Sequence, residues 1–284
     1  MLWDIFDQSR RLGGAPLNFA AHAGRLGHHA LLISAVGADA LGEEAVEAIQ
    51  ALGLTTAFLR KTSRYPTGSA RVHLGPRDQT HFTIERPAAY DAVNISDHTL
   101  AQLVSHAPDW LYFGTLFAST AAGEATLCRL SNALPAAVRF YDLNLRPECW
   151  SAPLVSRLLR NAHVVKLNEE ELDHVQEFTR LPRATEAFCR EGAKRYGWQA
   201  VCVTLGARGC AILARNGYVE SQGHAVNVAD TVGAGDAFAA AFMHGLISGW
   251  PADKIAAFAN RVGALVASRH GAIPAWTAEE AVAL

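Results

Sequence analysis

Short apolar runs alternate with segments of helical periodicity along most of the chain. Five runs are typical of buried strands: LLISAVG (31–37), WLYFG (110–114), RFYDLN (139–144), HVVKLN (163–168) and AVCVTLG (200–206). From about Leu41 to Leu52, the apolar residues Ala45, Ile49 and Leu52 recur at helical spacing. This alternation predicts an α/β fold: a doubly wound, mainly parallel sheet flanked by helices, with ligands at the carboxyl ends of its strands.

The segment from about residue 55 to 85 departs from this rhythm. It contains three runs of alternating polarity, TTAFLRKTS, GSARVHLG and THFTIE, which Tyr65-Pro66 and Gly75-Pro76 separate. The pattern predicts a small inserted antiparallel β-sheet. Such an insert serves as a lid over a site, as a surface for a second subunit, or as a mere excursion of the main sheet. Because no linker divides the chain, we expect a single domain over residues 1–284.

Composition narrows the classes of function. Of the 284 residues, 50% are hydrophobic, which suffices for a sizeable core, and 25 Lys and Arg against 27 Asp and Glu give a net charge of −2. A chain with such balanced charge has no overall positive electrostatic potential that would attract nucleic acid or an anionic membrane. The amino terminus lacks a signal-peptide pattern, and the most apolar stretch, 237–247, is shorter than the roughly 20 residues of a membrane span. We therefore expect a soluble, cytoplasmic protein.

Cysteine and histidine give little sign of a metal site or a disulfide framework. The five cysteines are scattered and contain no CxxC pair, which is typical of reduced thiols that mostly fill the core. The 12 histidines show no HExxH spacing, and His22, His28 and His29 are interpreted as surface or helix-face residues.

The segment DTVGAGDAFAAAFMHGL (230–246) carries the most specific chemistry. Gly233, Ala234 and Gly235 are small residues at the start of a strong helical run, where backbone N–H groups and the helix dipole form an anion hole suited to phosphate. Asp236 would repel a phosphate, but it suits a base that accepts the proton of an attacking hydroxyl. At a helix amino terminus it should ionise easily. The alternative is a first-turn acid that the dipole merely favours.

Two other phosphate-binding motifs are absent from the sequence. There is no GxxxxGK[ST] segment, and the third glycine of the dinucleotide fingerprint would fall at Phe238. The chain is therefore neither a P-loop enzyme nor a typical dinucleotide-binding protein.

A second group of residues suits a polyhydroxylated ligand. Gly13 and Gly14 permit close backbone approach, and Asn18 both donates and accepts hydrogen bonds. Asp4, an acid among apolar residues, can bind two hydroxyls or simply end a strand in solvent. Arg146 follows a strand, where it can hold a phosphate or a sugar acid, or be a plain loop arginine.

Further polar residues follow two of the predicted strands. Asn168 and Glu171 are three residues apart after a strand, close enough to hold Mg²⁺ through water beside a polyphosphate. VTLGARG (203–209) is a strand that enters a turn bounded by glycines, suited to backbone contacts with a nucleotide or to an ordinary tight turn.

Six motifs in order resemble the ribokinase-like carbohydrate kinases, the PfkB family, over essentially the whole chain. They are the GG…N segment, VGADALG (36–42), NEEE, TLGARG, DTVGAGDAF and ANRVGA (259–264). With ERPAAYD (85–91) and YDLNLRP (141–147), the sequence looks most like the fructokinase-type members. The resemblance implies a ribokinase-like fold and an ATP-dependent sugar kinase that transfers the γ-phosphoryl group to a sugar hydroxyl, fructose being the expected substrate.

The resemblance also implies roles for individual residues. Asp236 would be the catalytic base, with Gly233, Ala234 and Gly235 as the anion hole. Asn168 and Glu171 would organise Mg²⁺ and phosphate. The residues that would line the ATP site are Thr204, Gly206, Gly209 and Asn260. Those that would hold the sugar, with segment 55–85 as lid, are Asp4, Gly13, Gly14, Asn18 and Arg146.

Two further expectations follow from the family. A monovalent cation, K⁺, would bind through a loop matching Asp230 and Val232 and a second around Gly271, and the lid sheet would form a homodimer. Family members also carry residues before the segment matching LWDIF that complete a first central strand. The sequence begins at Met1, so either the start codon is assigned late or that strand is short here.

Alternative functions remain open on the sequence. Within sugars these are kinases for 2-keto-3-deoxygluconate, whose carboxylate Arg146 or Arg86 would bind, and for ribose. A non-sugar alcohol, such as a nucleoside, is a further acceptor class. The alternative from another class is a catalytically impaired protein that binds nucleotide and sugar.

Overall fold

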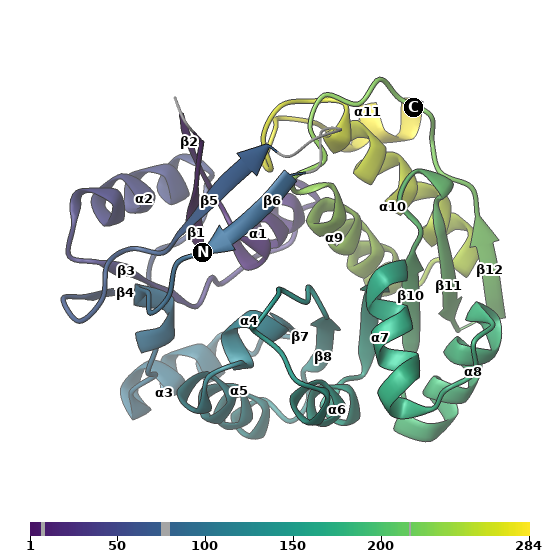
Figure 1. Cartoon of the computed structure of the whole chain (residues 1–284), viewed down its shortest axis with the longest axis horizontal. Helices are drawn as coiled ribbons and strands as arrows, with labels where there is room; N and C mark the ends of the chain where they lie inside the picture. Colours follow the sequence, from purple (N-terminus) through teal and green to yellow (C-terminus); the bar gives the residue numbers. More distant parts are fainter. Residues whose placement is uncertain (7–8, 75–79, 216) are drawn as a thin grey trace.

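A six-stranded sheet forms the centre of the computed structural model, which describes residues 1–6, 9–74, 80–215 and 217–284 (Figure 1). Its strand order is β12-β11-β10-β9-β8-β7. Four strands are parallel: β7 (Trp110–Gly114), β8 (Val138–Asp142), β9 (Val164–Asn168) and β10 (Ala200–Thr204). Two antiparallel strands, β11 (Cys210–Ala214) and β12 (Gly217–Ser221), complete one edge. The expectation of a mainly parallel sheet is confirmed.

Helices cover both faces of this sheet. On one face lie α1 (Ala15–Arg25), α9 (Ala234–Ile247) and α10 (Ala252–Ala267). On the other lie α4 (Thr115–Ala118), α5 (Ala121–Ala133), α6 (Ala152–Asn161), α7 (Glu169–Thr179) and α8 (Thr185–Tyr196). Consecutive strand residues contact opposite faces, as Phe140 and Tyr141 of β8 do, so the strands are largely apolar.

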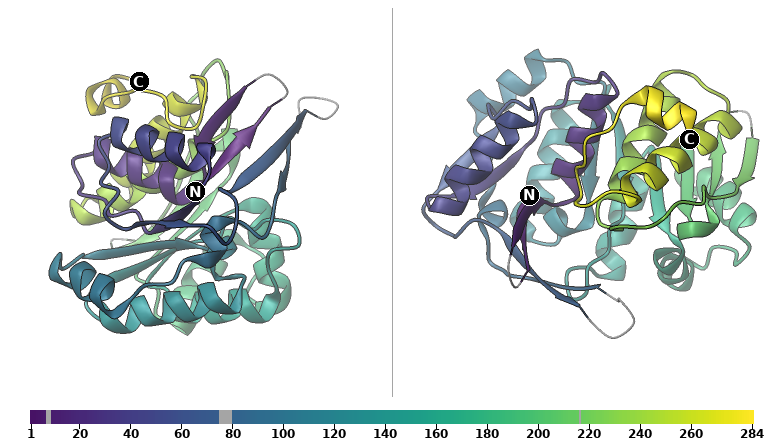
Figure 2. Two further views of the ribbon diagram at one scale, coloured as in Figure 1. Left: turned by 90° about the vertical axis from the view of Figure 1, so that its left-hand side faces the viewer. Right: turned by 90° about the horizontal axis from the view of Figure 1, so that it is seen from above.

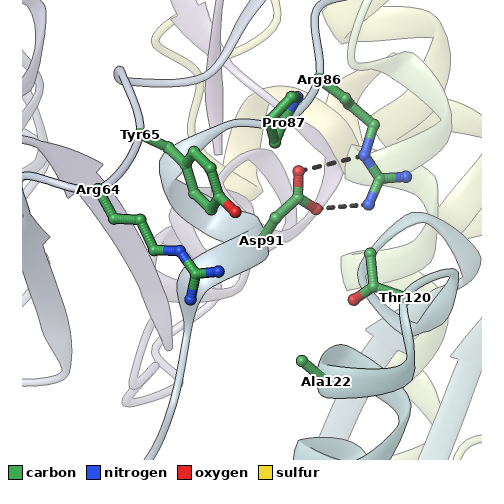
Figure 3. Close-up of a pocket in the computed structure, with 7 residues that line it drawn as sticks. All are labelled: Arg64, Tyr65, Arg86, Pro87, Asp91, Thr120 and Ala122. Atoms are coloured by element: carbon green, nitrogen blue, oxygen red, sulfur yellow. Dashed lines mark hydrogen bonds and ion pairs between the residues drawn. The ribbon is translucent and has the colours of Figure 1, made fainter.

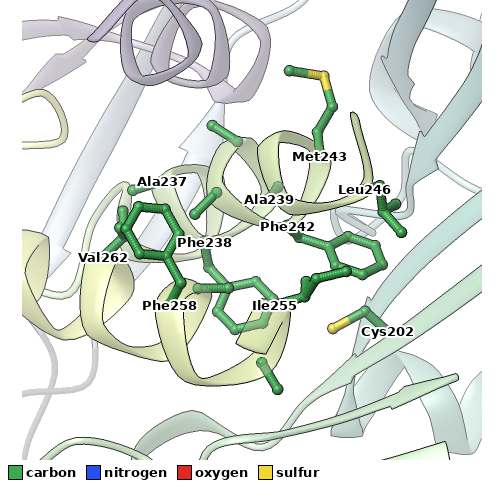
Figure 4. Close-up of a cluster of buried hydrophobic side chains, with 14 of the residues drawn as sticks. Cys202, Ala237, Phe238, Ala239, Phe242, Met243, Leu246, Ile255, Phe258 and Val262 are labelled. Carbon is green, nitrogen blue, oxygen red and sulfur yellow. The ribbon is translucent and has the colours of Figure 1, made fainter. Parts of the chain in front are cut away.

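The helix pair α9 and α10 packs closely over the sheet (Figure 4). A Cβ atom on Gly245 would lie 2.8 Å from Ile255 Cγ1, so the missing side chain allows the close approach of the two helices. Phe242 and Ile255 fill the space between the helices and the strands, and Phe258 packs against His244 and Trp250. This core fixes the position of the amino-terminal end of α9, where the predicted anion hole lies.

A second sheet has the strand order β2-β1-β5-β6 and projects from the α/β body (Figure 2). Its strands are β1 (Leu2–Ile5), β2 (Arg10–Gly13), β5 (Ser69–Leu74) and β6 (Thr80–Ile84). β1 is antiparallel to β2 and parallel to β5, and β5 is antiparallel to β6. The sheet was predicted from segment 55–85 alone, but it also contains the two amino-terminal strands β1 and β2.

The first strand of the predicted insert lies elsewhere. β4 (Leu59–Thr62) pairs in parallel with β3 (Ser34–Gly37) in a separate two-stranded sheet. The expected strand at 31–37 begins only at Ser34. Residues 75–79, with the predicted Gly75-Pro76 turn, lie outside the described part of the chain.

The remaining helices are α2 (Ala40–Ala51), α3 (Asp97–Ser105), α11 (Ala278–Ala283) and the 3₁₀ turns η2 (Ala89–Ala92) and η3 (Gly206–Arg208). The helix predicted from about Leu41 to Leu52 is α2, which Asp39 caps by accepting a 2.8 Å hydrogen bond from the Gly42 N–H. Among the helices of the described residues, none combines the length and apolar character that crossing a membrane requires.

Candidate active site

The turn that opens α9 has the geometry expected of an anion-binding turn. Gly233 is the N-cap, with φ of 82°, and a Cβ atom there would lie 2.4 Å from the Ala272 carbonyl oxygen. Both the positive φ and the close approach therefore require glycine. The 14-residue helix begins at Ala234, so its first backbone N–H groups lack helical acceptors and its dipole is positive here.

Asp236 lies in the first turn of α9 and is 9% exposed. Asn18, on α1, donates a 2.7 Å hydrogen bond from Nδ2 to Asp236 Oδ2. Burial raises the pKa of Asp236 to about 6, although the Asn18 hydrogen bond opposes the rise. The expectation that Asp236 ionises easily is wrong, because desolvation outweighs the helix dipole. The carboxylate is a better base than the sequence indicated, and it is mainly ionised at pH 7.

The residues predicted to hold the sugar gather around this acid. A Cβ atom on Gly13 would lie 3.2 Å from Asp4 Oδ2 and 3.5 Å from Asn18 Oδ1. Asn18 Oδ1 is buried and has no hydrogen-bond partner among the described residues. Burial raises the pKa of Asp4 to about 6, opposed by Arg146 and reinforced by Asp230 and Asp236. Two carboxyl groups and an unsatisfied amide oxygen therefore lie around one point, which suits a ligand with several hydroxyls.

Gly14 shapes the same region through its backbone. It is the N-cap of α1 with φ of 97°, and a Cβ atom on it would lie 3.2 Å from Met1 Cα. Glycine at this position allows α1 to begin directly beside β1, so that Asn18 in its first turns reaches Asp236.

The two arginines proposed for an acidic substrate differ in position. Arg146 is exposed, and its charge lowers the pKa of both Asp4 and Asp236, so it lies near the site. Arg86 pairs with Asp91 and donates a 2.6 Å hydrogen bond to Ser119 Oγ. It lines a separate cavity of about 500 Å³, whose lining includes neither Asp236 nor any of the residues around it (Figure 3). Of the two arginines, Arg146 is therefore the one available to a ligand beside Asp236.

Asn168 and Glu171 form a capping box at the start of α7. Asn168 Oδ1 accepts a 2.8 Å hydrogen bond from the Glu171 N–H, and Glu171 Oε2 accepts one of 2.9 Å from the Asn168 N–H. Glu171 Oε1 accepts a third, of 2.7 Å, from the Leu145 N–H. Glu171 is buried and each of its oxygens accepts one hydrogen bond, which leaves a second lone pair on each for a water. These residues therefore fit a water-mediated Mg²⁺ site.

The residues predicted to line the nucleotide site lie at the carboxyl end of β10 and beside it. Thr204 ends β10, and Gly206 and Gly209, with φ of 59° and 104°, bound η3. A Cβ atom on Gly209 would lie 2.0 Å from the Ser221 carbonyl oxygen, so this turn packs tightly against the end of β12. Asn260 Nδ2 donates to Ser221 Oγ at 3.2 Å and to the Gln222 carbonyl at 3.1 Å. Asn260 therefore anchors this loop, and only its oxygen is left for a ligand.

Among the residues predicted to hold K⁺, the Asp230 carboxylate is occupied by hydrogen-bond donors. Asp230 Oδ2 accepts from Arg11 Nη1 at 2.7 Å and from the Gly271 N–H at 3.0 Å, and Oδ1 accepts from the Val232 N–H at 3.0 Å. A guanidinium thus neutralises the carboxylate that a cation would need. This donor set does not fit a cation bound directly to Asp230.

His22 is a buried residue whose side chain contacts Ala272, the residue against which Gly233 packs. It is fully buried, accepts a 3.0 Å hydrogen bond at Nδ1 from Trp276 Nε1, and lies 2.9 Å through Nε2 from the Ala272 carbonyl oxygen that Gly233 approaches. Because Nδ1 accepts, Nε2 carries the proton, and burial lowers the pKa of His22 to about 4. His22 lies on the buried face of α1, so of the two interpretations as a surface or a helix-face residue only the first is wrong for this histidine.

A buried polar cluster next to the site was not predicted from the sequence. Lys166, Asp142 and Tyr112 lie on β9, β8 and β7 and are joined by hydrogen bonds. The available signal was one lysine and one aspartate, each inside an otherwise apolar strand, HVVKLN and RFYDLN. Opposite charges buried on neighbouring strands are expected to pair.

Comparison with known proteins identifies the family. The model of the pfkB family of carbohydrate kinases matches residues 4–279. A fructokinase of Escherichia coli is 30% identical over 277 residues, covering 93% of this chain and 88% of that protein. The structure of a fructokinase from Xylella fastidiosa with bound ATP superposes with a TM-score of 0.86 at 25% identity, over 99% of this chain and 94% of the other. A 2-dehydro-3-deoxygluconokinase from Thermotoga maritima has a TM-score of 0.88 at 18% identity, over 99% and 96%, which is a likeness of fold alone.

The chain belongs to the pfkB family of carbohydrate kinases. It is therefore a sugar kinase with a ribokinase-like α/β fold, and both predictions are confirmed.

Proposed function

We propose that the protein transfers the γ-phosphoryl group of ATP to a hydroxyl group of a sugar, with fructose as the substrate. The observation that carries the proposal is the 2.7 Å hydrogen bond from Asn18 to Asp236. It joins the residues suited to sugar hydroxyls directly to the acid beside the opening turn of α9. The 30% identity to a fructokinase favours fructose among the sugars.

In this mechanism, Asp236 is the catalytic base. The sugar hydroxyl lies between Asp236 and the terminal phosphorus. As its oxygen forms a bond to that phosphorus, the bond to the bridging oxygen of ADP breaks and the proton passes to Asp236. The backbone N–H groups at 233–235 stabilise the charge on the transferring group. Mg²⁺, when bound with ATP, neutralises the phosphates, and Glu171 and Asn168 would hold it through water.

Asn18 and Asp4 orient the acceptor. Asn18 has its Nδ2 on Asp236 and its Oδ1 free of protein partners within the described residues, so it can accept a sugar hydroxyl while fixing the base. Asp4 lies close to both and can accept two hydroxyls. We further propose that the second sheet closes over this region and excludes water, which would keep ATP hydrolysis without sugar slow.

A panel of acceptors tests the proposal. Turnover of fructose, ribose, 2-keto-3-deoxygluconate and adenosine is measured side by side by ADP release, each against a control without acceptor. We expect the highest kcat/KM with fructose. If none of the acceptors raises ADP release above the control, the proposed function is wrong.

A 2-keto-3-deoxygluconate kinase is the second candidate, because the Arg146 guanidinium acts on both Asp4 and Asp236 and can pair with a substrate carboxylate. Arg146→Gln separates the two candidates. It should raise the KM of the acid substrate by about tenfold while changing that of fructose by less than about threefold. Arg157→Gln, on the distant helix α6, is a control for the loss of one positive charge.

A further inference from the structure

A buried ion pair lies under the opening turn of α9. Lys166 and Asp142 are register partners on β9 and β8, and Lys166 Nζ donates to both carboxylate oxygens of Asp142, at 2.9 and 3.1 Å. Tyr112 Oη donates to Asp142 Oδ2 at 3.0 Å. Lys166 is 5% exposed and Asp142 is fully buried. Burying two charges is costly, and a pair of apolar side chains at these positions would stabilise the fold equally well. The ion pair therefore calls for a role other than stability.

The ammonium group of Lys166 lies next to the anion-binding turn. A Cβ atom built on Gly235 would be 3.8 Å from Lys166 Nζ, which is ordinary van der Waals contact. Within the described residues, the hydrogen-bond acceptors of Lys166 Nζ are the two oxygens of Asp142. An ammonium group has three N–H donors, and among the described residues those of Lys166 donate to Asp142 and not to the turn. The positive charge therefore lies beside the turn without a hydrogen bond to it.

Three carboxyl groups face this ammonium. Asp142 pairs with it directly, and the charges of Glu171 and Asp236 act on it from nearby. Arg146 is the other cation that acts on Asp236. Without Lys166, no buried cation would offset the negative charge of these three carboxyl groups. They would then repel a phosphate that binds at the turn.

We propose that Lys166 is a positioning residue of the phosphoryl-transfer site, whose buried ammonium offsets the charge of Asp142, Glu171 and Asp236 so that the turn at 233–235 accepts the terminal phosphate of ATP. Asp142 and Tyr112 hold the ammonium in place. Lys166 exchanges no proton during the transfer, since the hydroxyl proton goes to Asp236 and the bridging oxygen leaves with ADP. The inference rests on the proposed function for the identity of the nucleotide.

The affinities for ATP and ADP test this role, because only ATP places a phosphate at the turn. We expect Lys166→Met to weaken ATP binding by about tenfold and ADP binding by less than about threefold in calorimetry. Lys166→Arg keeps the charge and should retain most of the ATP affinity. Lys194→Met removes a charge from the exposed side of α8 and should change neither affinity. Equal affinities of Lys166→Met and wild type for ATP, or equal loss for both nucleotides, would overturn the proposal.

A second variant separates charge from folding. Lys166→Met alone leaves Asp142 unpaired in the interior, whereas Lys166→Met with Asp142→Asn buries no net charge and should fold. The double variant should show the same selective loss of ATP affinity and a kcat lowered by about 10- to 100-fold, with the sugar KM nearly unchanged. Wild-type ATP affinity and kcat in the double variant would refute the role of Lys166 while leaving the proposed function intact. A wild-type protein that binds ATP but phosphorylates no acceptor would refute the proposed function alone.

Discussion

Replacing Asn18 by leucine should shift the pH at which activity is lost in acid. In the wild-type protein the pKa of Asp236 is raised to about 6, and the 2.7 Å hydrogen bond from Asn18 is the strongest effect that opposes the rise. A hydrogen bond to a charged group contributes about 1.5 to 3 kcal/mol, and one pKa unit corresponds to about 1.4 kcal/mol. Leucine has a similar volume and offers no donor, so the pKa of Asp236 should rise by about one unit or more.

The sign of the effect follows from the role of the base. Protonated Asp236 cannot accept the hydroxyl proton, so kcat/KM should fall as the pH drops through the pKa, near 6 for the wild type. In Asn18→Leu the fall in kcat/KM should occur near pH 7, because the pKa of Asp236 is expected to be about one unit higher.

The assay is the dependence of kcat/KM for the sugar on pH between about 5 and 9, with saturating ATP. Asn132→Leu, at an exposed position on α5, makes the same chemical change away from the site and should leave the profile unaltered. If Asn18→Leu and the wild type lost activity at the same pH, the coupling between Asn18 and the base would be refuted.

Three further predictions concern the surroundings of the base. Asp4→Asn should raise the KM of the sugar by about tenfold and that of ATP by less than about twofold, and equal changes would contradict a sugar-binding role. Gly233→Ala should lower the free energy of unfolding by about 3 kcal/mol in urea, because it combines a positive φ with a clash against Ala272, whereas Gly24→Ala, in open space on α1, should not be destabilising. Undiminished stability of Gly233→Ala would contradict the geometry of the turn. Replacing K⁺ by tetramethylammonium should change kcat by less than about threefold, because Arg11 already neutralises Asp230, and a loss above about tenfold would contradict this.

The central sheet could be predicted from the sequence because buried parallel strands are continuous apolar runs. The runs at 110–114, 139–144, 163–168 and 200–206 all coincide with strands of the six-stranded sheet within about two residues. The glycine turn that opens α9 could also be predicted, since small residues before a helix carry a local signal, whereas its binding of an anion stays a prediction.

The second sheet could not be predicted in full, since its pairing joins distant segments. β1 pairs with β5, which lies more than sixty residues later, and a four-residue strand contains no information on its partner. The run TTAFLRKTS predicted a strand where β4 lies, but placed it in the inserted antiparallel sheet and not in parallel pairing with β3.

Burial explains why the structure of the site differs from its prediction at the remaining residues. The local sequence around Asp236 shows a helix amino terminus, which favours the ionised form, whereas the desolvation that raises its pKa comes from elements far along the chain. The same holds for His22 and Lys166, whose partners lie on other elements. In contrast, the capping box of Asn168 and Glu171 is a local pattern that the sequence NEEE contains.

The homodimer through the second sheet stays a prediction, which the molecular mass in solution would test. Its two outer strands, β2 and β6, are the edges available for pairing with a second copy.

The most direct test of the account is the activity of Asp236→Asn together with its affinity for ATP. Asparagine keeps the size of the side chain but cannot accept the hydroxyl proton, so kcat should fall by about 10³-fold or more while the affinity for ATP changes by less than about threefold. A variant that turns over sugar at close to the wild-type rate would contradict the assignment of Asp236 as the base, and with it the mechanism proposed for this site.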